Sequence, residues 1–385
     1  MPSTLPISVL AFAGALLVST LAPSYYRAGN IPVLLSIFWL FFTSTCIAIN
    51  TAGWHDSTTD KWRPFCEISI RLVYASAFGF QCCSALLLRR LEAIAATRYV
   101  SMTKAAKRRR IGIELGVGLL LPVLYVALAV VNQGHRYDII QTFGPVISIF
   151  PSVLSVIFST LPILLVSVIA TVYAILCSYW LYLRRRQLSA VLSSSGSGIN
   201  VSQYVRLFGL SCVEILWTVP VNWTVQMQNL FNRNPGGSIL YPYTSWADVH
   251  YDFGRIGQYP IELLQLSPVG RRNLPILYLG SLSSAISCFL FFGFLGTSTG
   301  FTRDIVTHFS KWWNAIMPPK RLPKREDALS RRRPSFSEDL SHPPLSPNEE
   351  LKMKHLDDSR VDDIHIEVLV ERERFEEPHL HRTNV

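Results

Sequence analysis

The chain has 385 residues, of which 49% are hydrophobic, 12% aromatic and only 16% charged, whereas a soluble domain carries about 25% charged residues. This composition excludes an ordinary soluble protein and favours one whose solvent is a lipid bilayer. The formal net charge is +10, and residues 1–296 hold 21 basic and 10 acidic side chains. We attribute this basic excess to membrane topology and expect no nucleic-acid partner.

Seven apolar runs are long enough to cross a bilayer, whose core of about 30 Å needs about 20 helical residues. The first run begins without Lys or Arg, so we predict a span and not a secretory signal. The fifth run is long enough to tilt or to project beyond the bilayer. The sequence therefore predicts an all-α membrane protein, a seven-transmembrane helix bundle. Its spans cover about residues 5–23, 31–52, 68–88, 111–132, 151–182, 207–230 and 274–296.

The Lys and Arg residues of the loops predict the orientation of the spans, because basic loops stay on the cytoplasmic side. Three loops on the side of the N-terminus hold seven basic residues, and one of these loops is long. The other side holds thirteen, most of them beside span ends in residues 89–110 and 184–206. We therefore predict an N-terminus outside the cell and a C-terminus inside.

The amino-acid composition of the chain changes after the seventh run. Residues 301–317 carry large apolar side chains at helical spacing, which predicts an amphipathic helix on the inner membrane surface. Pro318 and Pro319 end this helix. Residues 318–385 are rich in Pro, Ser and charges of both signs, so we expect a disordered cytoplasmic tail.

Few side chains in the apolar runs could form a catalytic, metal or cofactor site. No run holds a pair of histidines, a pair of aspartates or an HExxH motif, so we expect neither an enzyme, nor a metal site, nor a cofactor. The seven cysteines lie within apolar runs or, for Cys66, at the edge of one, which excludes a secreted disulfide scaffold. The last run has no Lys for a retinal Schiff base.

Three ionisable residues within or near the runs allow two interpretations each. Glu67 and Arg71 are four residues apart near the outer surface, where they could pair with each other or contact a ligand. Glu214 lies deep in the sixth run, where a carboxyl group is costly unless it faces the bundle. It could therefore make an interhelical hydrogen bond or have a role as a switch or ligand contact.

Pro220 lies within the sixth run and removes one backbone hydrogen bond, which predicts a kink. Trp217 and Asn222 are its neighbours. The group is compatible with simple packing and, equally, with a hinge through which an outer ligand moves the inner half of the helix.

Three strings carry a resemblance to a known family. They are HRYDIIQTFGP at 135–145, RRRQLSAVLSSS at 184–195 with YVRL at 204–207, and VHYDFGRIGQYP at 249–260. In this order they resemble the fungal mating pheromone receptors that sense lipidated peptides of the a-factor type, as at the B mating-type locus of mushrooms. The likeness covers about residues 5–300.

The resemblance implies a class D G-protein-coupled receptor in the plasma membrane. Its expected partners are a farnesylated peptide pheromone, a heterotrimeric G protein and membrane lipid. The alternative is a seven-span transporter of lipid or small solute without G-protein coupling. Transporters often repeat their set of spans, and the two halves of this chain show no such repeat.

The candidate functional residues fall into three further groups. Candidate ligand contacts in the two long outer loops are His135, Arg136, Tyr137, Asp138, Trp246, Tyr251, Asp252 and Tyr259. Candidate G-protein contacts are Arg89, Arg90, Arg184, Arg185 and Arg186. Candidate phosphorylation sites in the tail are Ser335 and Ser337, where added charge could uncouple the receptor.

Overall fold

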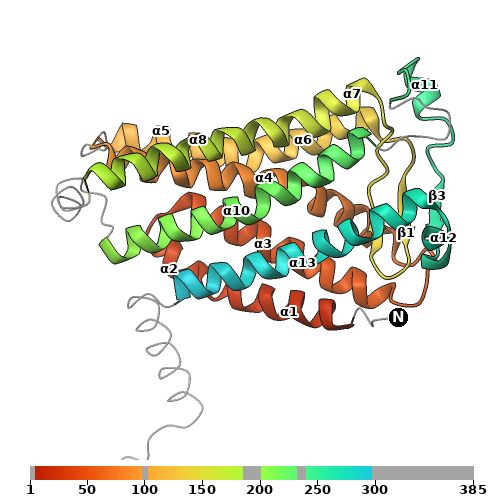
Figure 1. Ribbon diagram of the computed structural model, residues 1–385, viewed down its shortest axis with the longest axis horizontal. Coiled ribbons are helices and arrows are strands. Elements are labelled where there is room, and N and C mark those ends of the chain that lie inside the picture. Colours follow the sequence, from red (N-terminus) through yellow and green to blue (C-terminus); the bar gives the residue numbers. More distant parts are fainter. Residues whose placement is uncertain (1–4, 98–102, 185–200, 232–239, 297–385) are drawn as a thin grey trace, which may run out of the picture. The chain divides into compact units, whose positions relative to one another are not determined.

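The computed structural model describes residues 5–97, 103–184, 201–231 and 240–296. Several predictions from the sequence lie outside these residues: the amphipathic helix at 301–317, the tail at 318–385, and the candidate residues Arg185, Arg186, Ser335 and Ser337. Figure 1 shows the described residues as a bundle of long helices with a few strands at one end.

Seven helical segments in the described residues are long and apolar enough to cross a membrane, as predicted. The third span is longer than its apolar window, because the charged residues at both ends continue the helix. The bounds are α1 Leu5–Ser19 with α2 Ala22–Arg27; α3 Ile31–Gly53; α4 Arg63–Ala95; α5 Lys104–Leu115 with η1 Gly116–Leu120, α6 Leu121–Ala129 and η2 Val130–Asn132; α7 Val153–Ser155 with η3 Val156–Thr160 and α8 Leu161–Leu183; α10 Val201–Phe231; and α13 Pro268–Gly296.

Prolines shape the fourth and fifth spans. Pro122 and Pro162 each follow a wide π-helical turn, η1 or η3. A proline has no N–H, so the carbonyl four residues before it loses its helical donor. For Pro122 that carbonyl belongs to Gly118, and the indole Nε1 of Trp39 in α3 donates to it at 2.9 Å. A gap in the hydrogen bonds of one span is thus closed by a side chain of another.

The helices α3 and α4 form the centre of the bundle. About two thirds of their apolar windows are buried, against about one third in the fifth span. Tyr204 of α10 is fully buried there, and its hydroxyl donates to the carbonyl of Leu91 at 3.1 Å. The outer faces of α6 and α8 instead expose large apolar side chains such as Val123 and Ile175. Lipid can cover such faces, which water would not stabilise.

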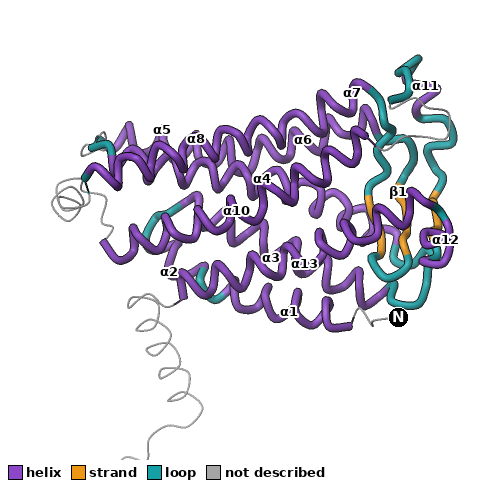
Figure 2. Tube along the Cα trace, viewed as in Figure 1, coloured by secondary structure: helices purple, strands orange, loops and turns teal. Residues whose placement is uncertain are grey.

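A small sheet, which the sequence analysis did not predict, lies at the end of the bundle where the chain begins (Figure 2). Its strands are β1 Tyr137–Ile140, β2 Gly144–Val146 and β3 Ile256–Tyr259. The order is β2-β1-β3, with β1 antiparallel to β2 and parallel to β3. The short helices α11 Trp246–Val249 and α12 Ile261–Leu266 flank β3 in sequence. We call this the sheet end, and the other the opposite end.

The sheet is anchored on α3 and α4. The backbone N–H of Thr142, in the turn between β1 and β2, donates to the carbonyl of Trp54 at 2.8 Å. Gly144 has a φ of +79°, and a Cβ at this position would lie 2.9 Å from the Asn50 side chain. Tyr137 and Ile139 are fully buried in one apolar cluster with Trp54. The sheet is therefore part of the packed structure.

The contact between α3 and α4 at Gly79 gives a first prediction. A Cβ added there would lie 2.6 Å from the Trp39 ring, which is itself 2% exposed and bonded to Gly118. Gly79→Ala should therefore destabilise the protein by about 1–3 kcal/mol through overpacking. Thermal unfolding in lipid nanodiscs measures this. Gly280→Ala is the control, because a Cβ there meets open space, and an equal loss in both variants would contradict the prediction.

Candidate ligand site at the sheet end

A cavity of about 650 Å³ lies at the sheet end of the bundle. Its wall combines side chains of the third to seventh spans with residues 145–149 and Pro151, which include the end of β2. Most of the lining is apolar, as in sites that take small or drug-sized ligands. Its apolar members include Ile70, Val73, Val156, Ile163, Val225 and Leu277, and its polar members include Tyr74, Asp138, Ser159, Asn222, Gln226 and Asn273.

Two stacked tyrosines form part of the cavity wall. The rings of Tyr74 in α4 and Tyr125 in α6 are parallel, with centroids 4.8 Å apart. The Tyr125 hydroxyl donates to the carbonyl of Ser159 at 2.8 Å, which joins the fourth and fifth spans. In addition, the hydroxyl of Thr160 donates to Gln226 Oε1 at 3.1 Å, which joins the fifth and sixth spans. The wall is thus held by hydrogen bonds between spans.

Of the polar lining residues, only Asp138 and Asn222 were among the predicted site residues, because the predicted ligand contacts all came from the outer loops. The available signal was the presence of tyrosine, glutamine and asparagine in otherwise apolar runs. Those residue types can bond to other spans or to a ligand, but the sequence does not indicate which of them share one cavity.

The residues predicted as ligand contacts in the outer loops have different positions in the structure. Asp138 lines the cavity. Tyr137 is fully buried in the cluster beneath the sheet, and its hydroxyl donates to Asp60 at 2.9 Å. Burial, together with this hydrogen bond, raises the pKa of the Tyr137 phenol. Tyr137 is therefore placed as a structural residue, in contrast with its predicted role as a ligand contact.

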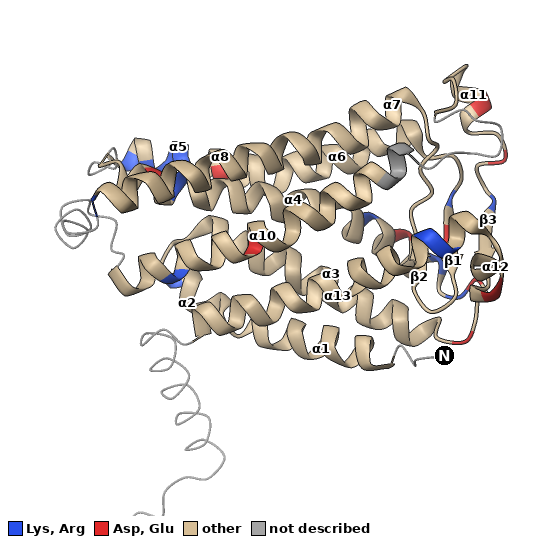
Figure 3. Cartoon of the chain, in the orientation of Figure 1, with Lys and Arg blue, Asp and Glu red and all other residues tan. Residues whose placement is uncertain are grey.

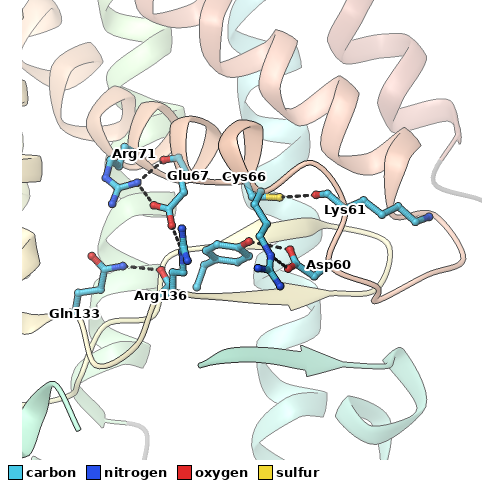
Figure 4. Close-up of polar contacts among 9 residues, drawn as sticks. Asp60, Lys61, Cys66, Glu67, Arg71, Gln133 and Arg136 are labelled. Carbon is cyan, nitrogen blue, oxygen red and sulfur yellow. Dashed lines mark hydrogen bonds and ion pairs between the residues drawn. The ribbon is translucent and has the colours of Figure 1, made fainter. Parts of the chain in front are cut away.

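Arg136 belongs to a polar cluster that ties β1 to α4 (Figure 4). Its guanidinium pairs with the carboxylate of Glu67, which also pairs with Arg71. The predicted pairing of Glu67 with Arg71 is confirmed, and the structure adds Arg136 from a distant part of the chain. Gln133 supports the same turn by donating from Nε2 to the carbonyl of Arg136 at 2.6 Å.

The other outer-loop candidates are not among the residues that line the cavity. Trp246 stacks on His250 with ring centroids 3.8 Å apart, and Tyr251 is 84% exposed. Asp252 adopts a φ of +53° in the turn before β3, and Tyr259 belongs to β3 itself. His135 contacts Asp138, with Nε2 2.6 Å from Oδ1. Only Asp138 of the eight predicted ligand residues lines the cavity.

The residues of the predicted switch lie along α10. Glu214 is 1% exposed, and its Oε2 accepts a hydrogen bond from the Ser287 hydroxyl of α13 at 3.0 Å. This is the interhelical bond that was one of its two interpretations. Pro220 lies within α10, and Asn222 lines the cavity. The Nε1 of Trp217 is buried without a hydrogen-bond partner among the described residues. A switch role for this group stays a prediction.

Figure 3 shows Lys and Arg residues on α5, at the end of the bundle opposite the sheet. The candidate arginines of this end have different surroundings. Arg89 is exposed, whereas Arg90 is 9% exposed and donates to Asn30 Oδ1 at 3.1 Å. The buried position of Arg90 does not suit its predicted contact with a G protein. Arg184 lies over the Trp180 ring, with Cζ 5.1 Å from the ring centroid, and donates to the Thr97 hydroxyl at 2.6 Å.

The described residues form a bundle of seven membrane-length helices with a ligand-sized cavity between the spans, an architecture that suits a membrane receptor. The sequence profile of the pheromone A receptor family matches residues 6–317, and the chain belongs to this family. The resemblance seen in the sequence is therefore confirmed, and the transporter alternative is set aside.

The chain is similar in sequence to pheromone receptors from several fungi. Pheromone receptor 2 of Mycosarcoma maydis is 36% identical over 294 residues, which are 76% of this chain and 81% of that protein. Pheromone B beta 1 receptor of Schizophyllum commune is 32% identical over 251 residues, which are 65% of this chain and 46% of that protein. The pheromone a factor receptor of Saccharomyces cerevisiae is 26% identical over 209 residues, or 52% and 43% of the two chains.

The position of Tyr137 gives a second prediction. Tyr137→Phe should lower the free energy of unfolding by about 1.5–3 kcal/mol, because it removes one hydrogen bond to a carboxylate, and should leave the cavity intact. The apparent Tm in nanodiscs measures this. Tyr251→Phe, at an exposed position, should leave the Tm unchanged. Unchanged Tm in Tyr137→Phe together with an altered ligand response would instead support a ligand contact.

Proposed function

We propose that this chain is a plasma-membrane receptor for a prenylated peptide pheromone and that it activates a heterotrimeric G protein. The observation that carries the proposal is the largely apolar cavity at the sheet end. Burying each CH₂ group of a ligand contributes about 0.8 kcal/mol. A farnesyl chain in this cavity would therefore supply most of the affinity, and the peptide would contact the polar residues of the wall.

The proposed orientation places the sheet end outside the cell. Basic side chains gather at the opposite end, where α5 alone carries Lys104, Lys107 and three consecutive arginines. Basic segments beside span ends are retained in the cytoplasm. The cavity then faces the medium from which a peptide arrives, and the basic end faces the cytoplasm.

The helix α10 offers a route from the cavity to the opposite end. Asn222 and Gln226 lie in the cavity wall, and Arg206 lies about 24 Å away along the same helix. Between them, Glu214 bonds to Ser287 of α13. A ligand that contacts Asn222 and Gln226 more favourably in one arrangement of α10 than in another would shift the equilibrium between them. The proposed switch requires no enzymatic chemistry.

The direct experiment is nucleotide exchange on a fungal G protein in membranes that contain the full chain. The ligands are farnesylated, methyl-esterified peptides and their unprenylated twins. The proposal expects exchange with prenylated members only. Silence across a diverse library, with the chain at the cell surface and a related receptor responding in parallel, would overturn it.

Filling the cavity gives a third prediction. Ala77 lies in the cavity wall on α4, so Ala77→Trp should occupy space that the prenyl chain needs. We expect the concentration of pheromone for half-maximal exchange to rise at least about tenfold, which corresponds to about 1.4 kcal/mol. Val172→Trp is the control, because Val172 is an exposed apolar residue of α8 outside the cavity lining. Equal responses of the two variants, at equal surface levels, would argue against this cavity as the prenyl site.

The cytoplasmic arginines give a fourth prediction. Replacing Arg184, Arg185 and Arg186 together with Ala should abolish pheromone-driven exchange, because a positive surface would be lost from the G-protein contact. Surface level, measured by antibody labelling, should stay unchanged. A matched triple variant of α5, Lys107, Arg108 and Arg109 to Ala, removes the same charge from the same end of the bundle. If both variants signal normally, these charges serve topology alone.

A further inference from the structure

The cavity has a charge pattern that a prenyl group alone does not explain. Among its described lining residues, Asp138 is the only one with a carboxylate, and none is a lysine, arginine or histidine. The other members are apolar or carry neutral hydroxyl and amide groups. A hydrocarbon chain gains nothing from a carboxylate, whereas a carboxylate in a partly buried wall is stabilised by a cation.

The fold holds the Asp138 side chain in place. In the sheet, Asp138 of β1 lies between Val146 of β2 and Gly257 of β3. A Cβ added at Gly257 would overlap Asp138 Oδ1, so the carboxylate crosses directly over this glycine. A larger residue at position 257 would displace it. His135 fixes it from a second side, with Nε2 2.6 Å from Oδ1.

Among the described residues, no guanidinium or ammonium group forms an ion pair with this carboxylate. Nη2 of Arg255 lies 3.4 Å from Nδ1 of His135, the ring nitrogen that does not contact Asp138. Ser148 also contacts that nitrogen, at 3.1 Å. Within the described residues, His135 is the only ion-pair partner of Asp138. The site therefore combines an apolar wall with one anchored carboxylate.

We propose that Asp138 selects ligands by charge, by pairing with a cationic nitrogen of the pheromone close to its prenylated end. This inference rests on the proposed function and adds the chemical class of the peptide. A neutral group leaves the carboxylate without a cation, and an anionic group is repelled. The cation could be a lysine or arginine side chain of the peptide or its amino terminus, because both present N–H donors with positive charge.

The test uses probes that share one prenyl group and differ in charge. Four derivatives of S-farnesylcysteine methyl ester carry an acetyl-lysyl, an acetyl-norleucyl, an acetyl-glutamyl or a norleucyl group with a free amino terminus. Their affinities for the full chain in nanodiscs are measured by displacement of a fluorescent farnesyl probe. We expect one of the two cationic probes to bind at least about tenfold more tightly than acetyl-norleucyl, and acetyl-glutamyl to bind most weakly. The tighter cationic probe identifies the source of the charge.

Two pairs of variants assign the preference to Asp138. Asp138→Asn should abolish the preference, and its apparent Tm in nanodiscs, compared with that of the unmodified chain, shows whether the variant is folded. Asp252→Asn, outside the cavity lining, should keep the preference. Gly257→Ala should weaken the preference by displacing the carboxylate, and Gly254→Ala should not, because a Cβ there meets open space.

The outcomes separate this inference from the proposed function. Equal affinity of the lysyl, free-amino and neutral probes in the unmodified chain would overturn the inference, and so would a preference that persists in Asp138→Asn. In either case, binding of the neutral probe would leave the prenyl site standing. If none of the four probes binds, the proposed prenyl site fails and the inference fails with it.

Discussion

Inside a bilayer, a backbone N–H or C=O has no water to bond with, and this constraint governs the structure. Seven helices satisfy most of these groups within themselves. Where Pro122 interrupts the pattern, the freed carbonyl of Gly118 receives the indole N–H of Trp39 from another span. Trp39 can reach it because Gly79 lets its ring lie directly against α4. One freed carbonyl and one missing side chain thus determine how α3 contacts α4 and the fourth span at this point.

At the sheet end, the strands β1, β2 and β3 pair their backbone N–H and C=O groups with each other. Glu67, Arg71 and Arg136 keep their charges together where α4 meets the sheet. The sheet in turn supplies one wall of the cavity, through residues 145–149 and Asp138. The candidate binding site is therefore built from rigid elements, which favours a defined ligand geometry.

The family and the geometry assign different parts of the function. Membership of the pheromone A receptor family rests on residues 6–317 and says nothing of which side chains meet the ligand. Trp246 and Tyr251 of the outer loop are exposed and are not part of the cavity wall. The geometry also shows that α10 contributes both to that wall and, through Glu214, to the contact with α13. A single helix with both contacts is the kind of element that a ligand can bias.

The sequence by itself determined the features that depend on neighbours along the chain. Apolar runs of sufficient length predicted seven spans, and the four-residue spacing of Glu67 and Arg71 predicted their pairing, because a helix fixes both relations locally. Span ends were less predictable: α4 begins at Arg63 and ends at Ala95, since charged residues continue a helix that an apolar window cuts short. Only the tertiary structure decided the rest. The pairing of β1 with β3 joins Tyr137 to Ile256, Arg136 reaches Glu67 from 69 residues away, and five spans meet around one cavity. These contacts depend on how the helices pack, and no local pattern in the sequence encodes which distant residues become neighbours.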